Sequence, residues 1–351
     1  MLLKKLSEAH GVSGHEKEVR AIIVEEIRGR VDAARVDAMG NLIARLKGTG
    51  ESPLRVLLAA HMDEVGLMIT QVEDGGLLHF AKVGGIDDRV LPARVVVIGE
   101  RRVPGVIGIK PVHLTEKSER DQVAGWKQLA IDIGASSKSE AEKLVQKGDL
   151  AVFAGDFREL AGAGSRWRTV QGKAFDDRAG CAMLAELLKD RYAFDVAAAF
   201  TVQEEVGLRG ARVAAYAENP DFAVVLECTP ANEVPTKKDL SPSTRLAGGP
   251  AITLRDTSFI ADPRLVALFS DTARDLGIAH QFKQPNIGGT DAGSIHRARG
   301  GVPTITIAVP ARYIHTPAAI MDLNDFDATI ALTREALRRL PAAVGGARRS
   351  V

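Results

Sequence analysis

The alternation of strand-like and helix-like segments restricts the fold of this chain more than any other feature. After about residue 169, apolar runs typical of buried strands alternate with helical patterns; examples are "DDRAGCAMLAELLKD", "DVAAAFTVQEE", "FAVVLE" and "PTITIAVP". Near the N-terminus, a helical pattern in which Ser13 and Glu16 have capping-box spacing precedes the strand-like runs "NLIARLKG" and "LRVLLAAH". Such alternation is typical of a layered α/β domain with a mostly parallel sheet.

The middle of the chain, from about Gly66 to Gly164, has a different pattern. Short β-like runs are separated there by glycine, proline and charged residues, as in "LLHFAKV", "ARVVVIG", "VPGVIGIK" and "DLAVFA". Several short strands with closely spaced turn signals favour a small β-barrel or sandwich. We therefore predict an α/β domain of residues 1–66 and 164–351, interrupted by an inserted β-barrel-like domain of residues 67–163.

Charge and hydropathy exclude several classes of protein. Lysine and arginine number 46 against 45 aspartates and glutamates, so there is no positive excess to attract nucleic acid. No apolar stretch is long enough to span a membrane, and the N-terminus "MLLKKLSEAHG" lacks the core of a signal peptide. Cys181 and Cys228 do not have the spacing of a disulfide framework or a zinc finger, so we interpret both as buried small side chains. We expect a cytoplasmic, soluble protein that binds neither nucleic acid nor membranes.

Polar side chains gather where the predicted strands end and where one predicted helix begins. These residues are His61 and Asp63, Asp176 and Asp177, Glu204 and Glu205, Glu227, and His315. Because the carboxyl ends of parallel strands meet at one edge of a sheet, we expect these side chains to converge. Taken singly, each has an ordinary interpretation, such as a helix N-cap, a solvated loop tip or a structural histidine–aspartate pair. Together they form an acidic cluster, which is tolerable mainly around cations.

The charges of this cluster balance for a centre of two metal ions. The predicted ligands are three carboxylates and two neutral imidazoles, namely Asp176, Glu205, Glu227, His61 and His315. Two divalent ions neutralise the three carboxylates and one bridging hydroxide. Nitrogen and oxygen ligands without thiolate suit Zn²⁺, Co²⁺ or Mn²⁺.

Two of the remaining acids, Glu204 and Asp63, have other predicted roles. In an extended segment Glu204 faces away from Glu205, and a free carboxylate beside metal-bound water is a general base. Asp63 shares a face with His61 and is predicted to orient that imidazole, whereas Glu64 points away.

The motifs that carry these residues resemble those of the M42 family of metallo-aminopeptidases. The similarity covers nearly the whole chain and includes "AAHMDEVG", "AFDDRAG", "TVQEEVGLRGA", "NIGGTDAG" and "YIHTP", in this order. Within the inserted segment, "VIGIKPVHL" and "IDIGASSKSEAEKLVQKGD" are similar to the dimerisation domain of that family.

The resemblance implies a function, an assembly and a distribution of ligands. The function is removal of N-terminal residues from peptides, and the assembly is a hollow tetrahedral dodecamer built from dimers. By motif, His61 and Glu227 hold one metal, Glu205 and His315 hold the other, Asp176 bridges both, and Glu204 is the base. The peptide bond between Asp176 and Asp177 is expected to be cis. The family usually has aspartate in place of Glu227, whose longer side chain keeps the charge but changes its reach.

Substrate contacts and some alternatives stay open at this point. "GGTDAG" offers Gly289, Thr290 and Asp291 to the substrate, or is a plain turn before a helix. "TPANEVPTKKDLSPSTRL" follows Glu227, and its basic residues Lys237, Lys238 and Arg245 either favour acidic N-terminal residues or are simply solvated. The alternative functions are a deacylase or carboxypeptidase on a related dinuclear fold, an endoglucanase, and a noncatalytic shell protein. The endoglucanase is disfavoured because a glycosidase uses a positioned pair of carboxyl groups rather than two metal ions. The shell protein is disfavoured because it would need no general base such as Glu204.

Overall fold

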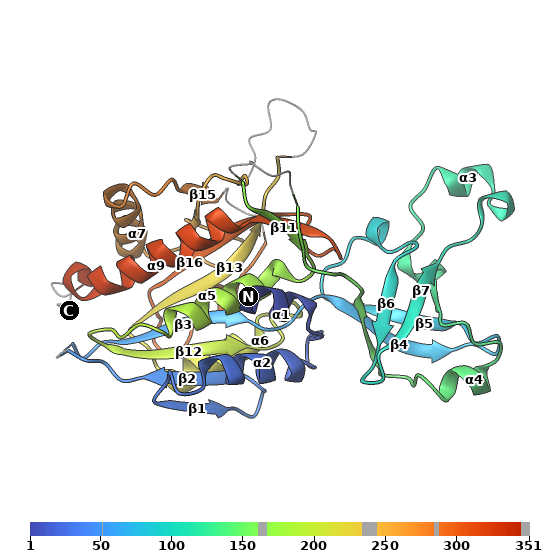
Figure 1. Ribbon diagram of the computed structural model, residues 1–351, viewed down its shortest axis with the longest axis horizontal. Coiled ribbons are helices and arrows are strands. Elements are labelled where there is room, and N and C mark those ends of the chain that lie inside the picture. The colour runs from blue at the N-terminus through green and yellow to red at the C-terminus, as the bar shows by residue number, and fades with distance from the viewer. Residues whose placement is uncertain (51, 161–166, 234–243, 284–287, 345–351) are drawn as a thin grey trace.

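The computed structural model describes residues 1–351 apart from 51, 161–166, 234–243, 284–287 and 345–351. The chain forms a larger α/β body and a smaller β-barrel that lies at one end of it (Figure 1). The first and last helices of the chain, at residues 2–8 and 323–344, belong to the α/β body, so the barrel is an insertion. The layered α/β fold with an inserted barrel, predicted from the sequence, is confirmed.

A mixed sheet forms the centre of the α/β body. Its central strands run parallel in the order β12 (Asp195–Thr201), β3 (Arg55–His61), β13 (Phe222–Pro230) and β16 (Thr304–Arg312). Antiparallel strands flank them: β2 (Leu42–Leu46) and β1 (Ala33–Val36) on one side, and β17 (Ala319–Asp322), β11 (Thr169–Gly172) and β10 (Arg158–Glu159) on the other. β14 (Ala251–Thr253) pairs with β16 and with β15 (Gln281–Lys283). Parallel pairing is therefore confined mainly to the strands that carry the predicted ligands.

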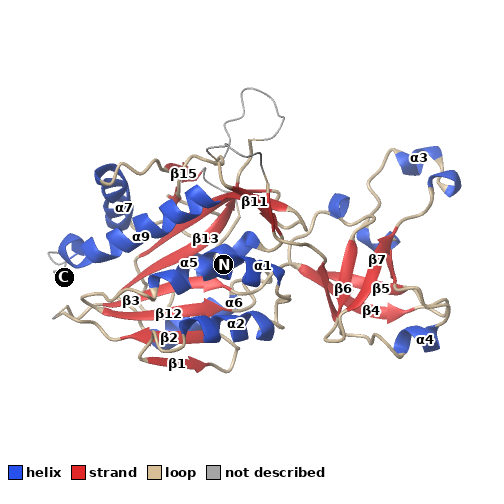
Figure 2. Ribbon diagram, viewed as in Figure 1, coloured by secondary structure: helices blue, strands red, loops and turns tan. Residues whose placement is uncertain are grey.

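The central strands are apolar on both faces because helices cover them. α5 (Phe175–Leu187) packs on β3 and β13 and contacts α1 (Leu2–Glu8), α2 (Lys17–Ile27) and α9 (Leu323–Val344). α6 (Arg209–Glu218) and α8 (Ala292–Ile295) pack on each other and on β12, β13 and β16, while α7 (Pro263–Asp275) packs on α9. All residues of β13 up to Thr229 are buried, as expected for a strand covered on both faces. Figure 2 shows the helices packed against the sheet.

The barrel closes on itself and has its own core. Its strands are β4 (Gly66–Val72), β5 (Leu78–Val83), β8 (Ala130–Asp132), β7 (Val103–Gly108), β6 (Val95–Ile98) and β9 (Leu150–Phe153), in that order around the barrel. Buried and exposed residues alternate along β7, and its core packs Ile107 with Val96 and Ile131. The short helices α3 (Lys117–Arg120) and α4 (Lys138–Glu142) lie outside the barrel (Figure 1).

Two details of the predicted elements differ from the structure. α2 begins after Glu16 and has no capping hydrogen bond from a side chain, so the predicted capping box of Ser13 and Glu16 is wrong. The side chains of both residues are used in contacts with the centre described below. Glu227 does not end its strand, because β13 continues to Pro230 alongside β16.

Among the helices of the described ranges, none is both long enough and apolar enough to cross a membrane.

Candidate metal centre

Parallel register brings the predicted site residues to one edge of the sheet. β12 pairs Thr201 with His61, so the segment that carries Glu204 and Glu205 leaves the sheet beside the end of β3. On the other side of β3, β13 pairs Val225 with Ala59, two residues before Glu227 and His61 respectively. The convergence expected at the strand ends is therefore present in the fold.

His61 is buried and presents one ring nitrogen to a group of carboxylates. Its Nδ1 lies 3.2 Å from the backbone oxygen of Asp63 and 3.4 Å from the Asp63 carboxylate. Its Nε2 lies 3.2 Å from Asp176 Oδ1, 3.6 Å from Glu227 Oε2 and 3.9 Å from Glu204 Oε2. Asp63 thus lies against Nδ1 and leaves Nε2 directed at the acids, and its role as an orienting residue stays a prediction.

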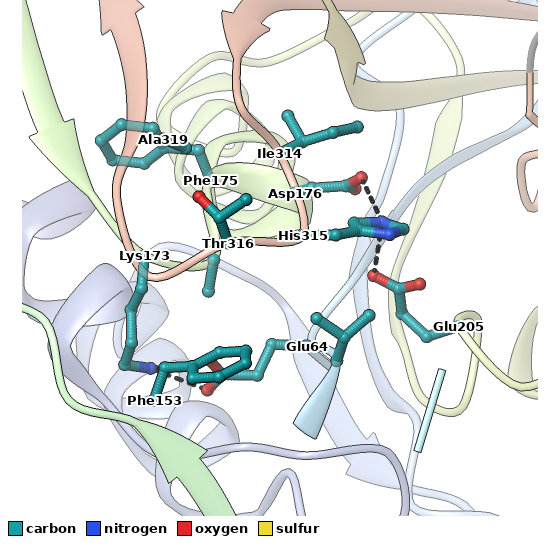
Figure 3. A pocket seen from close by; sticks show the side chains of 12 residues that line it. Glu64, Phe153, Lys173, Phe175, Asp176, Glu205, Ile314, His315, Thr316 and Ala319 are labelled. Atoms are coloured by element: carbon teal, nitrogen blue, oxygen red, sulfur yellow. Dashed lines mark hydrogen bonds and ion pairs between the residues drawn. The ribbon is translucent and has the colours of Figure 1, made fainter. Parts of the chain in front are cut away.

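His315 completes the other half of the cluster. Its Nε2 lies 3.2 Å from Asp176 Oδ2 and 3.2 Å from Glu205 Oε1, and both contacts are visible in Figure 3. Its Nδ1 lies 2.7 Å from the backbone oxygen of Gly85, in the segment that follows β5 of the barrel. The two oxygens of Asp176 therefore face two different imidazoles. The peptide bond between Asp176 and Asp177 is cis, which confirms that prediction.

Burial and close contacts shift the pKa values of several groups of this centre. Burial raises the pKa of Glu204 and of Glu227 well above the usual range. Burial alone lowers the pKa of His315, but the contacts of its ring with the carboxylates of Asp176 and Glu205 outweigh burial and raise that pKa to about 11.

The donor set fits divalent cations better than it fits hydrogen bonding alone. One atom from each of His61, Asp177 and Glu227 lies within 4.8 Å of the other two, and the same holds for His61, Asp176 and Glu205. Glu205 Oε1 is buried and has no hydrogen bond of acceptable geometry to any described residue, although it faces His315. A buried carboxylate oxygen without a donor is costly unless a cation satisfies it. Imidazole and carboxylate ligands without a thiolate suit Zn²⁺, Co²⁺ or Mn²⁺.

Comparison with known proteins assigns the chain to a family. Residues 40–332 match the family described as M42 glutamyl aminopeptidase, and residues 1–22 match a family described as AMPT. The chain belongs to the M42 family of aminopeptidases. A relative from Acetivibrio thermocellus, named as an aminopeptidase, is 39% identical over 96% of this chain and 97% of its own length. The lysyl aminopeptidase of Pyrococcus furiosus is 32% identical over 97% of this chain and 96% of its own length.

Solved structures of TET aminopeptidases share both parts of this M42 fold. The enzyme from Thaumarchaeota archaeon SCGC AB-539-E09 has a TM-score of 0.93 and 36% identity, covering 98% of this chain and 97% of its own. The TET1 peptidase of Pyrococcus horikoshii has a TM-score of 0.82 and 38% identity, covering 96% of this chain and 98% of its own. That peptidase can assemble into a tetrahedron or a large octahedral shell. The resemblance inferred from the sequence motifs is confirmed at the level of the family.

The acidic pair of this M42 aminopeptidase is placed by a turn, which corrects the extended segment expected from the sequence. β12 stops at Thr201, and Gln203 has a φ of 58°, in the left-handed region. The backbone N–H groups of Glu204 and Glu205 donate to the two oxygens of Asp63, at 3.0 and 3.1 Å. The two glutamates still separate as predicted, because Glu204 faces His61 and Glu205 faces His315.

The glycine-rich segment before α8 is mostly buried behind the centre. Thr290 and Asp291 are buried, whereas Gly289 is exposed. Asp291 Oδ2 accepts from the Thr201 hydroxyl at 2.5 Å, and burial raises the pKa of Asp291 to about 6. The Thr290 hydroxyl donates to Asp256 at 3.1 Å. These partners hold the segment beside the acids, and its contact with substrate stays a prediction.

Of the basic residues considered for substrate preference, one lies in the described part of the chain. Lys237 and Lys238 fall outside the described residues. Arg245 is exposed. The two cysteines are buried and unpaired, as predicted, and Cys181 Sγ donates to the backbone oxygen of His61 at 3.1 Å.

A buried ion network next to the centre was not predicted. Glu64 does not point to solvent: Lys173 Nζ donates to both of its oxygens at 2.8 Å, and Arg178 Nη2 donates at 3.0 Å (Figure 3 shows the lysine pair). Arg178 also donates to the backbone oxygens of Met62 and Leu6, at 2.7 and 2.6 Å. The network fixes the chain on either side of the ligand segments. Its signal in the sequence is a charged residue in or beside two of the ligand motifs: Glu64 in "HMDEVG", and Lys173 and Arg178 on either side of "AFDD".

Proposed function

We propose that this M42 chain removes N-terminal residues from peptides at a centre of two divalent metal ions. The proposed ligands are His61, Asp176, Glu205, Glu227 and His315, and Zn²⁺ or Co²⁺ is expected, with Mn²⁺ as a further possibility. The observation that supports this most is the position of Asp176 between two imidazoles, with 3.2 Å from each of its oxygens to one Nε2. We assign His61 and Glu227 to one ion, and Glu205 and His315 to the other, with Asp176 bridging.

The proposed mechanism gives separate tasks to the acids of the centre. When bound, the metal ions supply Lewis acidity and lower the pKa of the attacking water. Glu204 accepts a proton from that water and returns it to the leaving amine. Its carboxylate is buried within 3.9 Å of the His61 ring, next to the proposed ligands but not among them. Asp63 keeps His61 and the backbone of Glu204 in place.

The carboxylate of Glu204, which lies outside the charge balance of the two ions and their ligands, suits a substrate with a free α-amino group. An α-ammonium group is attracted to a carboxylate-rich site, and this attraction offsets the free energy that the desolvation of both charged groups costs. This selects peptides with an unblocked N-terminus over acylated ones. A deacylase or a carboxypeptidase on the same fold lacks this selection.

The decisive experiment is an activity assay on metal-free protein with and without added Zn²⁺ or Co²⁺. Aminoacyl-p-nitroanilides are the substrates, their N-acetylated forms are the matched controls, and a soluble cellulose derivative tests the endoglucanase alternative. We expect metal-dependent release only from the free amino forms. Release of acetate from the acetylated forms would favour a deacylase, and release of p-nitroaniline from them at an equal rate would show that a free amino group is not required. No turnover of any substrate would favour a shell protein. A panel of acidic, basic and apolar aminoacyl groups tests the preference attributed to Arg245.

We also propose that the inserted domain, residues 67–163, makes a dimer contact and that dimers build a dodecamer. The supporting observation is a run of exposed apolar side chains on β6, β7 and the segment that follows: Val95, Val106, Ile109, Val112 and Leu114 are 45–67% exposed. Exposed apolar surface of this kind marks sites of association. The tetrahedral assembly of the similar TET1 peptidase agrees with the proposal.

A further inference from the structure

We propose that Glu16 is a positioning residue for the general base, acting through the backbone of the segment Val202–Glu205. The inference builds on the proposed function, because it assumes that Glu204 is the base. It assigns a role to the N-terminal stretch "GVSGHE", which contributes no ligand to the centre.

The segment Val202–Glu205 is held by an unbroken series of side-chain acceptors. Its four successive N–H groups donate to Asn41 Oδ1 at 3.0 Å, Glu16 Oε1 at 3.2 Å, Asp63 Oδ1 at 3.0 Å and Asp63 Oδ2 at 3.1 Å. β12 has already ended at Thr201, so strand pairing does not hold these amides. The acceptors come from positions 16, 41 and 63, all distant in sequence from the segment that they bind.

Glu16 binds the residue of this segment that most needs support. Gln203 has a φ of 58°, a conformation that residues other than glycine rarely adopt. Such conformations persist where the surroundings over-determine them, and they are concentrated at functional sites. Gln203 directly precedes Glu204, so its backbone conformation sets the direction in which the Glu204 side chain leaves the chain.

The contacts of Glu16 separate this role from helix capping. Glu16 is 3% exposed, and its Oε1 also accepts from the backbone N–H of Gly14 at 2.6 Å. Although Glu16 stands at the N-cap position of α2, its side chain makes no capping hydrogen bond to that helix. A buried carboxylate is retained where hydrogen bonds offset its desolvation, and these two donors connect the N-terminal loop to Gln203.

Neighbouring residues of the same loop reinforce the connection. The Ser13 hydroxyl donates to Asp63 Oδ2 at 2.6 Å, and Asp63 in turn accepts from the amides of Glu204 and Glu205. The backbone N–H of Glu64 donates to the Gly11 oxygen at 2.9 Å. The N-terminal loop is thus fixed to the strand end that carries His61 and to the turn that carries Glu204, and it keeps these two residues in register.

The test compares two substitutions that both remove the charge, of which one keeps a strong hydrogen-bond acceptor and the other does not. Glu16→Gln keeps a side-chain oxygen at the same position, whereas Glu16→Met fills similar volume without an acceptor. We expect E16M to lower kcat by about 10- to 100-fold, because small displacements of a catalytic group have effects of this order. We expect KM to change less than kcat, bound metal to stay at the wild-type level, and E16Q to restore most of the lost kcat.

Asp322 offers a matched control away from the centre. It is fully buried, and its Oδ1 also accepts from two backbone N–H groups, those of Asn324 at 2.9 Å and Arg168 at 3.2 Å. Asp322→Leu is therefore expected to lower the melting temperature, as E16M does, while leaving kcat per folded molecule unchanged. Equal losses of kcat in D322L and E16M would reduce the role of Glu16 to general stability and overturn the inference.

Amide hydrogen exchange gives a readout that does not depend on activity. In peptides that cover Val202–Glu205, exchange should be faster in E16M than in wild type, and close to wild type in E16Q and D322L. Unchanged exchange in E16M, fast exchange of this segment in the wild type, or a kcat of E16M that excess metal restores in full would each refute the proposal. Wild-type protein without peptidase activity but with this exchange pattern would reject the proposed function and retain the backbone role of Glu16.

Discussion

Glu204 and Glu205 are adjacent in the sequence, yet their carboxylates lie beside different histidines. Glu204 Oε2 is 3.9 Å from His61 Nε2, and Glu205 Oε1 is 3.2 Å from His315 Nε2. The turn at Gln203 and the bonds of both amides to Asp63 produce this separation. At the scale of the residue, one acid is therefore free for proton transfer while its neighbour is directed at the opposite half of the centre.

Glu204→Gln should abolish most turnover while both metal ions remain bound. The amide has nearly the same shape but does not accept the proton of the attacking water, and general bases contribute about 10²- to 10⁴-fold to rates. The measurement is kcat together with metal content by elemental analysis, with the exposed Glu100→Gln as control. Turnover near the wild-type level in a metal-replete E204Q enzyme would assign the base to another residue.

Lys173→Met should destabilise the folded protein through Glu64. Breaking a buried ion pair leaves an uncompensated charge and costs about 3–5 kcal/mol, and the low end applies because Arg178 remains beside Glu64. Equilibrium urea unfolding of the K173M protein measures the loss. The double variant E64Q/K173M should lose less unfolding free energy than the sum of the losses in the two single variants. A double-variant loss equal to that sum would show that the pair is not coupled.

At the scale of the element, the barrel places apolar side chains where the body of the protein does not cover them. β6 and β7 are short strands in which buried and more exposed residues alternate. One set of their side chains therefore forms the barrel core, and the other set faces outward. Val95 and Val106 lie directly opposite each other on these two strands. Leu114, in the segment after β7, is 60% exposed. Val95 and Val106 thus form an exposed apolar pair on the outer face of the barrel.

Val106→Asp and Leu114→Asp should weaken self-association. A charge within an apolar contact is buried without a partner, so the associated form loses stability relative to the free subunit. Light scattering should show smaller particles for both variants, with little change in the far-UV circular dichroism. Val36→Asp, at an exposed position on β1 of the α/β body, is the control. An unchanged particle mass for both barrel variants would show that this face of the barrel does not form the subunit interface.

At the scale of the whole molecule, the proposed ligands come from both sides of the insertion. His61 precedes the barrel in the chain, and Asp176, Glu205, Glu227 and His315 follow it. Bound metal would therefore hold together two chain segments that the barrel separates, and it would relieve the repulsion among the buried carboxylates. His315 also contacts the backbone of Gly85, which links the centre to the base of the barrel.

Removal of metal should inactivate the enzyme, lower its melting temperature and dissociate the proposed dodecamer toward dimers. The dimer should persist because the proposed ligands lie outside the barrel strands. Chelation followed by size analysis and thermal melting measures this, and re-addition of Zn²⁺ or Co²⁺ should reverse it. An intact dodecamer and an unchanged melting temperature in verified metal-free protein would show that metal binding is not coupled to assembly.

Local sequence signals, taken together, explain why the central strands and most of the candidate site could be predicted. Hydrophobic runs located β3, β12, β13 and β16, and the general rule that ligands bind at the carboxyl ends of parallel strands then grouped His61, Glu205, Glu227 and His315 in advance. The family motifs added the cis bond before Asp177. Each of these inferences needs only the order of residues within a short segment, together with the direction of the strand that carries it.

The sequence alone determined the element types, the inserted barrel and the identity of the acids and histidines at the strand ends, because each depends on local periodicity. Only the tertiary structure decided the partners of Glu16 and Glu64 and the turn at Gln203. Glu16 meets Gln203 across 187 residues and Lys173 meets Glu64 across 109, and no local pattern encodes such pairs. The packing of α1, α2 and α5 against the sheet brings these groups together, and once buried they must find the partners that offset their desolvation.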